Sequence, residues 1–292
     1  MYYLLYGFLY TLSLLPWRVL YFLSDVVYTI LYYVIGYRRD VVMKNLSIAF
    51  PQKTEKERTR ISKDFYHSFL DTFIETIKFL SISDKEFSKR ISGNFDLLND
   101  LYKTGQNIQI HSAHFFNWEY MNWAIPKLST YPFVGVYLPI ENKAFNKIIL
   151  DMRQRYHSIM VSTVNFKTSF HQIAKGRYAL GLYTDQNPPF PAQSFWIPFF
   201  GKLTPFLPGP EKSARINNTA IVFVQYYKVK RGYYHAEFEL VTTTPQEFGR
   251  GQLTKKYVAY LEDCLRKRPS NYLWSHRRWK HEFNEEYRKM VV

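Results

Sequence analysis

The first part of the chain is almost continuously apolar or aromatic, from Tyr2 to Tyr37. Pro16 and the pair Arg18 and Asp25 interrupt it. Neither side of the proline supplies a clean run of the roughly 20 apolar residues that a transmembrane helix needs. We therefore expect an in-plane or partly inserted helical hairpin, with a buried helix of the core as the alternative.

Basic residues follow this apolar stretch directly, at Arg38, Arg39 and Lys44. They place that end beside anionic headgroups on the cytoplasmic side of a membrane. A cleaved signal peptide is disfavoured, because residues 1–6 carry no cation. We expect residues 1–45 to form membrane-anchoring helices and residues 46–292 to form one folded domain.

A helical pattern comes next and opens on a capping box, Thr54 to Glu57. Apolar residues then recur every four positions, which predicts an amphipathic helix whose apolar face packs on the domain. They are Ile61, Phe65, Phe69, Phe73 and Ile77. Ser83 begins another helix in the same manner.

From Ile108 to Val241 short apolar runs alternate with helical segments, which predicts a layered α/β domain with a mixed sheet flanked by helices. The predicted strands are 108–110, 132–137, 158–161, 178–183, 220–226 and 235–241. The predicted helices are 118–125, 143–155, 167–175, 209–217 and 251–266. Residues 195–210 mix Phe, Trp, Pro and Gly densely, so we expect irregular structure there.

The net charge and the aromatic content indicate an anionic binding partner but do not identify it. The chain carries a net charge of +15 with 25 Tyr, 24 Phe and 6 Trp, and aromatic rings of this kind favour interfaces with lipid. Such a charge fits lipid phosphate, an acidic protein or nucleic acid. Nucleic-acid binding would need a recognised binding module, which the sequence lacks, so we predict none. The single Cys264 cannot form an intramolecular disulfide.

The candidate chemistry lies just after the first predicted strand, in the six residues from His114 to Glu119. An imidazole in the turn and a carboxylate on the following helix can form a general base with an orienting partner. The alternative is that His114 caps the helix and Glu119 is solvated. Asp185 and Gln186 follow another predicted strand, so they can reach the same edge of the sheet, with a turn aspartate as the alternative.

No metal site is predicted, because His111 and His114 have no third ligand nearby. A serine nucleophile is not predicted either, since Gly-x-Ser-x-Gly is absent.

Several blocks of the sequence occur in a characteristic order. They are 36–39, 44–46, Phe50-Pro51, 114–119, Asp185-Gln186, 198–201, Thr204-Pro205, Gly209-Pro210 and 272–280. In this order they resemble the bacterial lysophospholipid acyltransferase superfamily, and within it the late acyltransferases of lipid A biosynthesis, of the lauroyl/myristoyl type. Phe116 and Leu138 depart from the family pattern, which has Gly and Arg there.

This resemblance implies a glycerolipid acyltransferase-like fold and an enzyme at the cytoplasmic face of the bacterial inner membrane. It implies transfer of a fatty acyl chain from acyl carrier protein, or from coenzyme A, to a hydroxyl of a lipid A precursor, without a cofactor. His114 is then the base and Glu119 its orienting partner. The residues expected to bind substrate are Asn117, Arg153, Arg155, Asp185, Gln186, Arg277 and Arg278.

Two alternatives stay open. The acceptor can be a lyso-aminolipid or lysophospholipid, since Leu138 replaces the usual cation. The chain can also be a non-catalytic basic protein that binds lipid or nucleic acid through a degenerate site.

Overall fold

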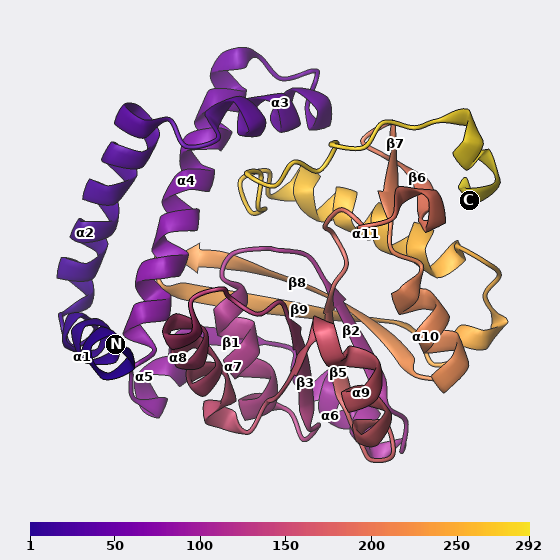
Figure 1. The fold of residues 1–292 in the computed structure, drawn as a ribbon, viewed down its shortest axis with the longest axis horizontal. Coiled ribbons are helices and arrows are strands. Elements are labelled where there is room, and N and C mark those ends of the chain that lie inside the picture. The colour runs from indigo at the N-terminus through magenta and orange to yellow at the C-terminus, as the bar shows by residue number, and fades with distance from the viewer.

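The core is a seven-stranded mixed sheet with the order β1-β9-β8-β2-β5-β3-β4 (Figure 1). The computed structural model describes the backbone of residues 1–292 and, apart from Lys167, their side chains. The hairpin β8–β9 is antiparallel and the other neighbouring strands are parallel. The strands are β1 (Ile91–Gly93), β2 (Ile108–Ser112), β3 (Phe133–Tyr137), β4 (Ile159–Ser162), β5 (Ala179–Tyr183), β8 (Ala220–Lys230) and β9 (Tyr233–Thr242).

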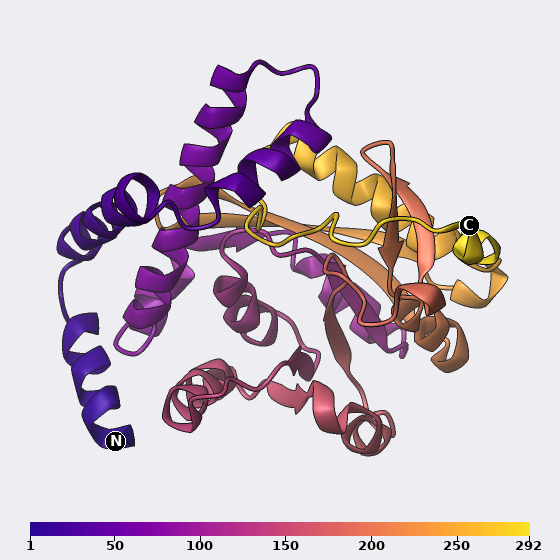
Figure 2. The same ribbon diagram turned by 45° about the horizontal axis from the view of Figure 1, so that its top comes forward.

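Helices cover both faces of this sheet, which confirms the predicted α/β architecture. The helices α7 and α8 lie on one face, and α9 and α11 lie on the other (Figure 2). The α-helices are α1 (Tyr2–Ser13), α2 (Trp17–Thr29), α3 (Arg39–Ala49), α4 (Glu55–Lys78), α5 (Asp84–Ser88), α6 (Asp96–Lys103), α7 (Trp118–Leu128), α8 (Lys143–Arg153), α9 (Phe166–Ile173), α10 (Gly209–Asn217) and α11 (Gln252–Lys267). A π-helical turn, η1 (Ile30–Ile35), continues α2, and short 3-10 turns are η2 (Gln154–Tyr156), η3 (Thr163–Asn165), η4 (Pro191–Gln193), η5 (Pro245–Glu247) and η6 (Glu285–Met290).

The expectation of irregular structure over 195–210 is wrong. Strands β6 (Phe195–Phe199) and β7 (Lys202–Phe206) form a separate antiparallel ribbon. Its prolines, Pro198 and Pro205, are compatible with strand structure because each strand of a two-stranded ribbon has one edge without a ladder partner. Dense aromatic residues therefore belong to a packed hairpin.

The N-terminal helices pack along α4 (Figure 1). The continuous helix Trp17–Ile35 has a mean hydropathy of 1.4 over 18 residues, so its length and composition suffice to cross a membrane. The sequence interpretation, that no segment beside Pro16 is suitable, is thus wrong for this helix. Only 22% of that window is buried, and Phe22, Val26 and Val34 point outward. This surface suits contact with lipid better than a place in the core.

Candidate active site

His114 and Asp185 meet at the carboxyl edge of the sheet. They follow β2 and β5, which pair in parallel with Ser112 beside Tyr183. The carboxyl ends of neighbouring parallel strands face the same crevice. Nδ1 of His114 lies 2.8 Å from Oδ1 of Asp185.

This pair has the electrostatics of a base held by an anion. Burial of the Asp185 side chain raises its pKa, but attraction to His114 and hydrogen bonds outweigh burial, and the pKa lies below its ordinary value. An ionised carboxylate only accepts hydrogen bonds, so Nδ1 of His114 carries the proton and Nε2 is the basic nitrogen. Nε2 lies 3.4 Å from the Gln186 amide nitrogen, and the imidazole is 21% exposed. His114 can therefore take a proton from a bound hydroxyl.

Glu119 does not occupy the place predicted for it. Its buried carboxylate accepts from Nε of Arg153 at 3.0 Å and from Nη2 of the same side chain. Asn122 adds a hydrogen bond of 3.1 Å. Burial raises the Glu119 pKa, but Arg153 outweighs that effect and the pKa is lowered. The physical reason is that α7 points Glu119 toward the end of α8, so Asp185 is the partner that the structure gives to His114.

Asn117 is buried away from any substrate, contrary to its predicted binding role. It is fully buried and caps α7, with Oδ1 accepting from the backbone N–H of Glu119 at 2.9 Å. Its Nδ2 donates to Oε2 of Glu75, also at 2.9 Å. Asn117 thus fixes the start of α7, as an N-cap residue does.

Arg155 also binds protein groups in place of the predicted substrate. Its guanidinium donates to the carbonyl of Ile82 at 3.0 Å and to Asp84 at 3.2 Å, and it lies over the Trp123 ring. It ties the end of η2 to the segment after α4.

Arg277 and Arg278 separate into one exposed and one buried side chain. Arg278 is 0% exposed and donates to Asn187 Oδ1 at 3.0 Å and to the Pro205 carbonyl at 2.9 Å. It holds the loop after Asp185 against β7, which corrects the prediction that it binds substrate. Arg277 is exposed and lines a polar pocket of about 300 Å³ with Lys44 and Lys280.

An apolar groove of about 300 Å³ begins beside this site, between α1, α4, α7 and α8. Trp118 stands in its wall, 5.9 Å from the His114 ring, and Glu119 with Arg153 forms a polar part of the lining. The sequence did not predict it. A feature of the sequence that could have indicated the groove is the C-terminal part of the apolar stripe of α4. Phe73 belongs to that stripe and is 48% exposed in the structure. The apolar lining is Leu9, Phe73, Ile77, Leu80, Ile140, Phe145, Ile148, Ile149 and Met152.

His111 belongs to the core and not to this site. It is buried, its Nε2 lies 2.9 Å from the side chain of Gln109, and burial lowers its pKa to about 4. Among the side chains that the structure describes, no three His, Cys, Asp or Glu residues gather to hold a metal ion.

Comparison with known proteins relates the chain to enzymes of lipid A biosynthesis. The family model for bacterial lipid A biosynthesis acyltransferases matches residues 1–281. The chain is 24% identical over 272 residues to the lipid A biosynthesis palmitoleoyltransferase of Escherichia coli (strain K12), covering 91% of this chain and 86% of that protein. The lipid A biosynthesis acyltransferase of Shigella flexneri matches over the same share at the same identity. These relatives and the exposed helix Trp17–Ile35 indicate membrane association. The match over nearly the whole chain confirms the resemblance: the protein is an acyltransferase and belongs to the bacterial lipid A biosynthesis acyltransferase family.

Proposed function

We propose that this protein moves a fatty acyl chain from a thioester, of acyl carrier protein or of coenzyme A, to a hydroxyl of a lipid A precursor. The observation that carries the proposal is the His114–Asp185 pair, 2.8 Å apart, beside an apolar groove. The reaction takes place at the cytoplasmic face of the inner membrane, with residues 1–45 as the anchor and residues 46–292 as the catalytic domain.

The chemistry is a direct transfer without an acyl-enzyme. Nε2 of His114 removes the proton of the acceptor hydroxyl, and the oxygen attacks the thioester carbonyl. The C–S bond then breaks, and the thiolate takes the proton back from the imidazolium. Asp185 stabilises the imidazolium while it exists.

The oxyanion that forms on the thioester carbonyl needs hydrogen-bond donors. Two backbone N–H groups of the turn are already used, because Phe116 donates to Asn271 at 3.2 Å and Glu119 donates to Asn117. The amide of Gln186, beside Nε2 of His114, supplies the donor in our proposal.

The groove holds the acyl chain. Each buried methylene contributes about 0.8 kcal/mol, so a long apolar lining favours long chains. Glu119 holds Arg153 by two nitrogens, and the remaining Nη1 is available to an anionic group of the donor or acceptor.

Acyl transfer by the purified protein tests the function. With acyl carrier protein and coenzyme A thioesters offered separately, we expect product from a lipid A precursor and a loss of 10²-fold or more, about the range for a general base, in His114→Ala. Full activity of His114→Ala would reject the assignment. Transfer to lysophospholipid, with none to the precursor, would correct the acceptor.

A further inference from the structure

Glu75 occupies a buried position in the last turn of α4, where three other elements meet. It is 0% exposed and accepts three hydrogen bonds. Tyr21 of α2 donates to Oε1 at 2.9 Å, Tyr234 of β9 donates to Oε2 at 2.7 Å, and Asn117 donates to Oε2 at 2.9 Å. Glu75 therefore links the chain segment of the active site to two distant elements.

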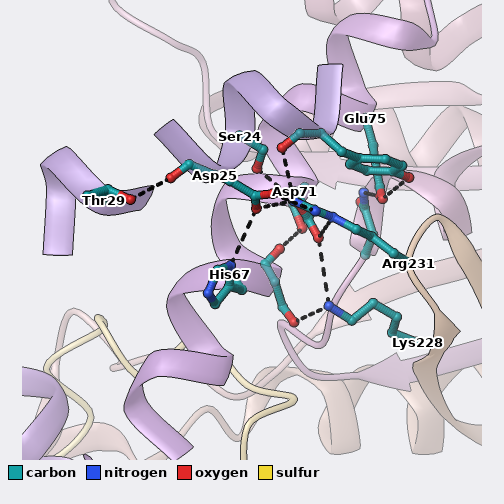
Figure 3. Close-up of polar contacts among 12 residues, drawn as sticks. Ser24, Asp25, Thr29, His67, Asp71, Glu75, Lys228 and Arg231 are labelled. Carbon is teal, nitrogen blue, oxygen red and sulfur yellow. Dashed lines mark hydrogen bonds and ion pairs between the residues drawn. The ribbon is translucent and has the colours of Figure 1, made fainter. Parts of the chain in front are cut away.

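Asp71, one turn earlier on α4, has a different task (Figure 3). It binds Arg231 at 2.7 Å and accepts from Ser24 of α2 at 2.9 Å, while Arg231 also binds Asp25. These contacts dock α2 against α4 and the β8–β9 turn. Only the second carboxylate, Glu75, reaches the turn that carries His114.

Asn117 can present only one atom to Glu75. Its Oδ1 is used by the backbone N–H of Glu119, so a rotated amide would lose the cap of α7. Its Nδ2 must therefore face an acceptor, and Glu75 is that acceptor. Asn117 lies between His114 and Glu119 in the sequence. A shift of Asn117 therefore moves both the turn that carries His114 and the start of α7.

A carboxyl group at this buried position lowers the stability of the fold. Burial, followed by repulsion from Asp71, raises the Glu75 pKa to about 7 against the hydrogen bonds that lower it. Among the side chains that the structure describes, no cation pairs with the Glu75 carboxylate; Tyr21, Tyr120 and Tyr234 lie around it on α2, α7 and β9. Burying a carboxyl group without a cation costs stability, and buried groups with shifted pKa values cluster at functional sites, which favours a role beyond stability.

We propose that Glu75 is a positioning residue for acyl transfer, which acts by holding Asn117 and so fixes the turn of His114 and the start of α7. This inference rests on the proposed function, because its kinetic readout is acyl transfer. It adds a residue from α4 that touches neither substrate nor the reacting atoms.

Exchange of the amide and the carboxylate between the two positions tests it. Asn117→Asp keeps the cap oxygen but sets two carboxyl groups against each other. We expect kcat to fall about 100-fold, the scale for a misplacement of 1 Å, with little change in KM. The double variant Glu75→Gln/Asn117→Asp restores the hydrogen bond in reverse, since the Tyr234 hydroxyl can accept as well as donate. We expect kcat to return to within about tenfold of wild type.

Asp71→Asn is the matched control, on the same helix and equally buried. We expect it to lower the melting temperature and leave kcat unchanged. Amide hydrogen exchange over residues 118–121 gives a readout that does not depend on activity. We expect the exchange rate to be higher in Asn117→Asp than in wild type and to fall again in the double variant. Wild-type kcat in Asn117→Asp, or no rescue of kcat and exchange in the double variant, would overturn the proposal. An inactive wild-type protein would count against the proposed function instead, while exchange still tests Glu75.

Discussion

Asp185 and Glu75, two carboxyl groups that bind residues of the His114 turn, are both buried, yet their net pKa shifts have opposite signs. Asp185 has an imidazole at 2.8 Å and keeps a lowered pKa. Glu75 has only neutral donors, and its pKa is raised to about 7 from 4.5. Asp185 is thus ionised at neutral pH, whereas Glu75 changes its charge near pH 7.

The raised pKa of Glu75 gives stability a pH dependence of known sign. The folded state binds the proton more tightly than the unfolded state, so this stabilisation is complete below pH 4.5 and is lost as pH rises through about 7. Between these limits the loss is about 3 kcal/mol at most.

Urea unfolding of wild type and Glu75→Gln at pH 5 and 7.5 measures this dependence. We expect wild type to lose stability relative to the variant as pH rises. The histidines His67, His111 and His276, whose pKa values burial lowers, act in the opposite direction but are present in both proteins. Equal pH slopes would contradict the prediction.

Residue types at strand ends were enough to select His114 and Asp185, but not to pair them. Both follow predicted strands, and the strand order that brings β5 beside β2 depends on long-range packing. Glu119 is nearer in sequence, and both its spacing from His114 and the family resemblance favour it over Asp185. The same limit applies to Arg278 and Arg155. The sequence shows that each carries a positive charge, but it does not show that the side chain is bound by groups of the protein itself.

At the scale of elements, α4 combines two tasks along one stripe. Phe65 and Phe69 are buried in the core, as the four-residue period predicted. Phe73 and Ile77 continue the same period but line the groove. The four-residue period predicts which face of the helix is apolar. Whether a position on that face is buried in the core or lines the groove depends on the neighbouring helices, here α1 and α8.

Filling this groove should shorten the accepted acyl chain. In Ile149→Trp the larger side chain excludes terminal methylenes, each worth about 0.8 kcal/mol. Four excluded methylenes would reduce the preference for a long chain by about 3 kcal/mol, or roughly 100-fold. The ratio of kcat/KM for C14 and C10 thioesters measures it. Ile216→Trp, at an exposed position of α10, is the control. A chain-length profile that does not change would exclude the groove as the acyl site.

For the whole molecule, the N-terminal helices set the side that faces a membrane. Phe22 and Val26 of α2 are 64% and 41% exposed, and the net charge of +15 adds attraction to anionic lipid. The apolar pattern of residues 2–37 predicted such a segment. It did not predict that the turn η1 would extend α2 to Ile35, because periodicity cannot locate where the helix ends.

Phe22→Asp/Val26→Asp should weaken binding to vesicles that contain anionic lipid. Charged groups on this face must be desolvated to enter the lipid, which costs more than the lost apolar contact alone. Co-sedimentation measures the bound fraction. Ile216→Asp, on α10 at the other end of the molecule from α2 (Figure 1), should bind like wild type. Equal binding of all three proteins would place the membrane contact elsewhere.

The most direct test of the account is the kcat of Asp185→Asn in acyl transfer. Asparagine keeps the shape but holds the imidazole in the wrong tautomer, with the proton on Nε2. We predict a fall in kcat on the order of 10³–10⁴-fold with the fold intact, as for the comparable change in a serine protease triad. A kcat within a few-fold of wild type would contradict the claim that Asp185 orients His114 as the base.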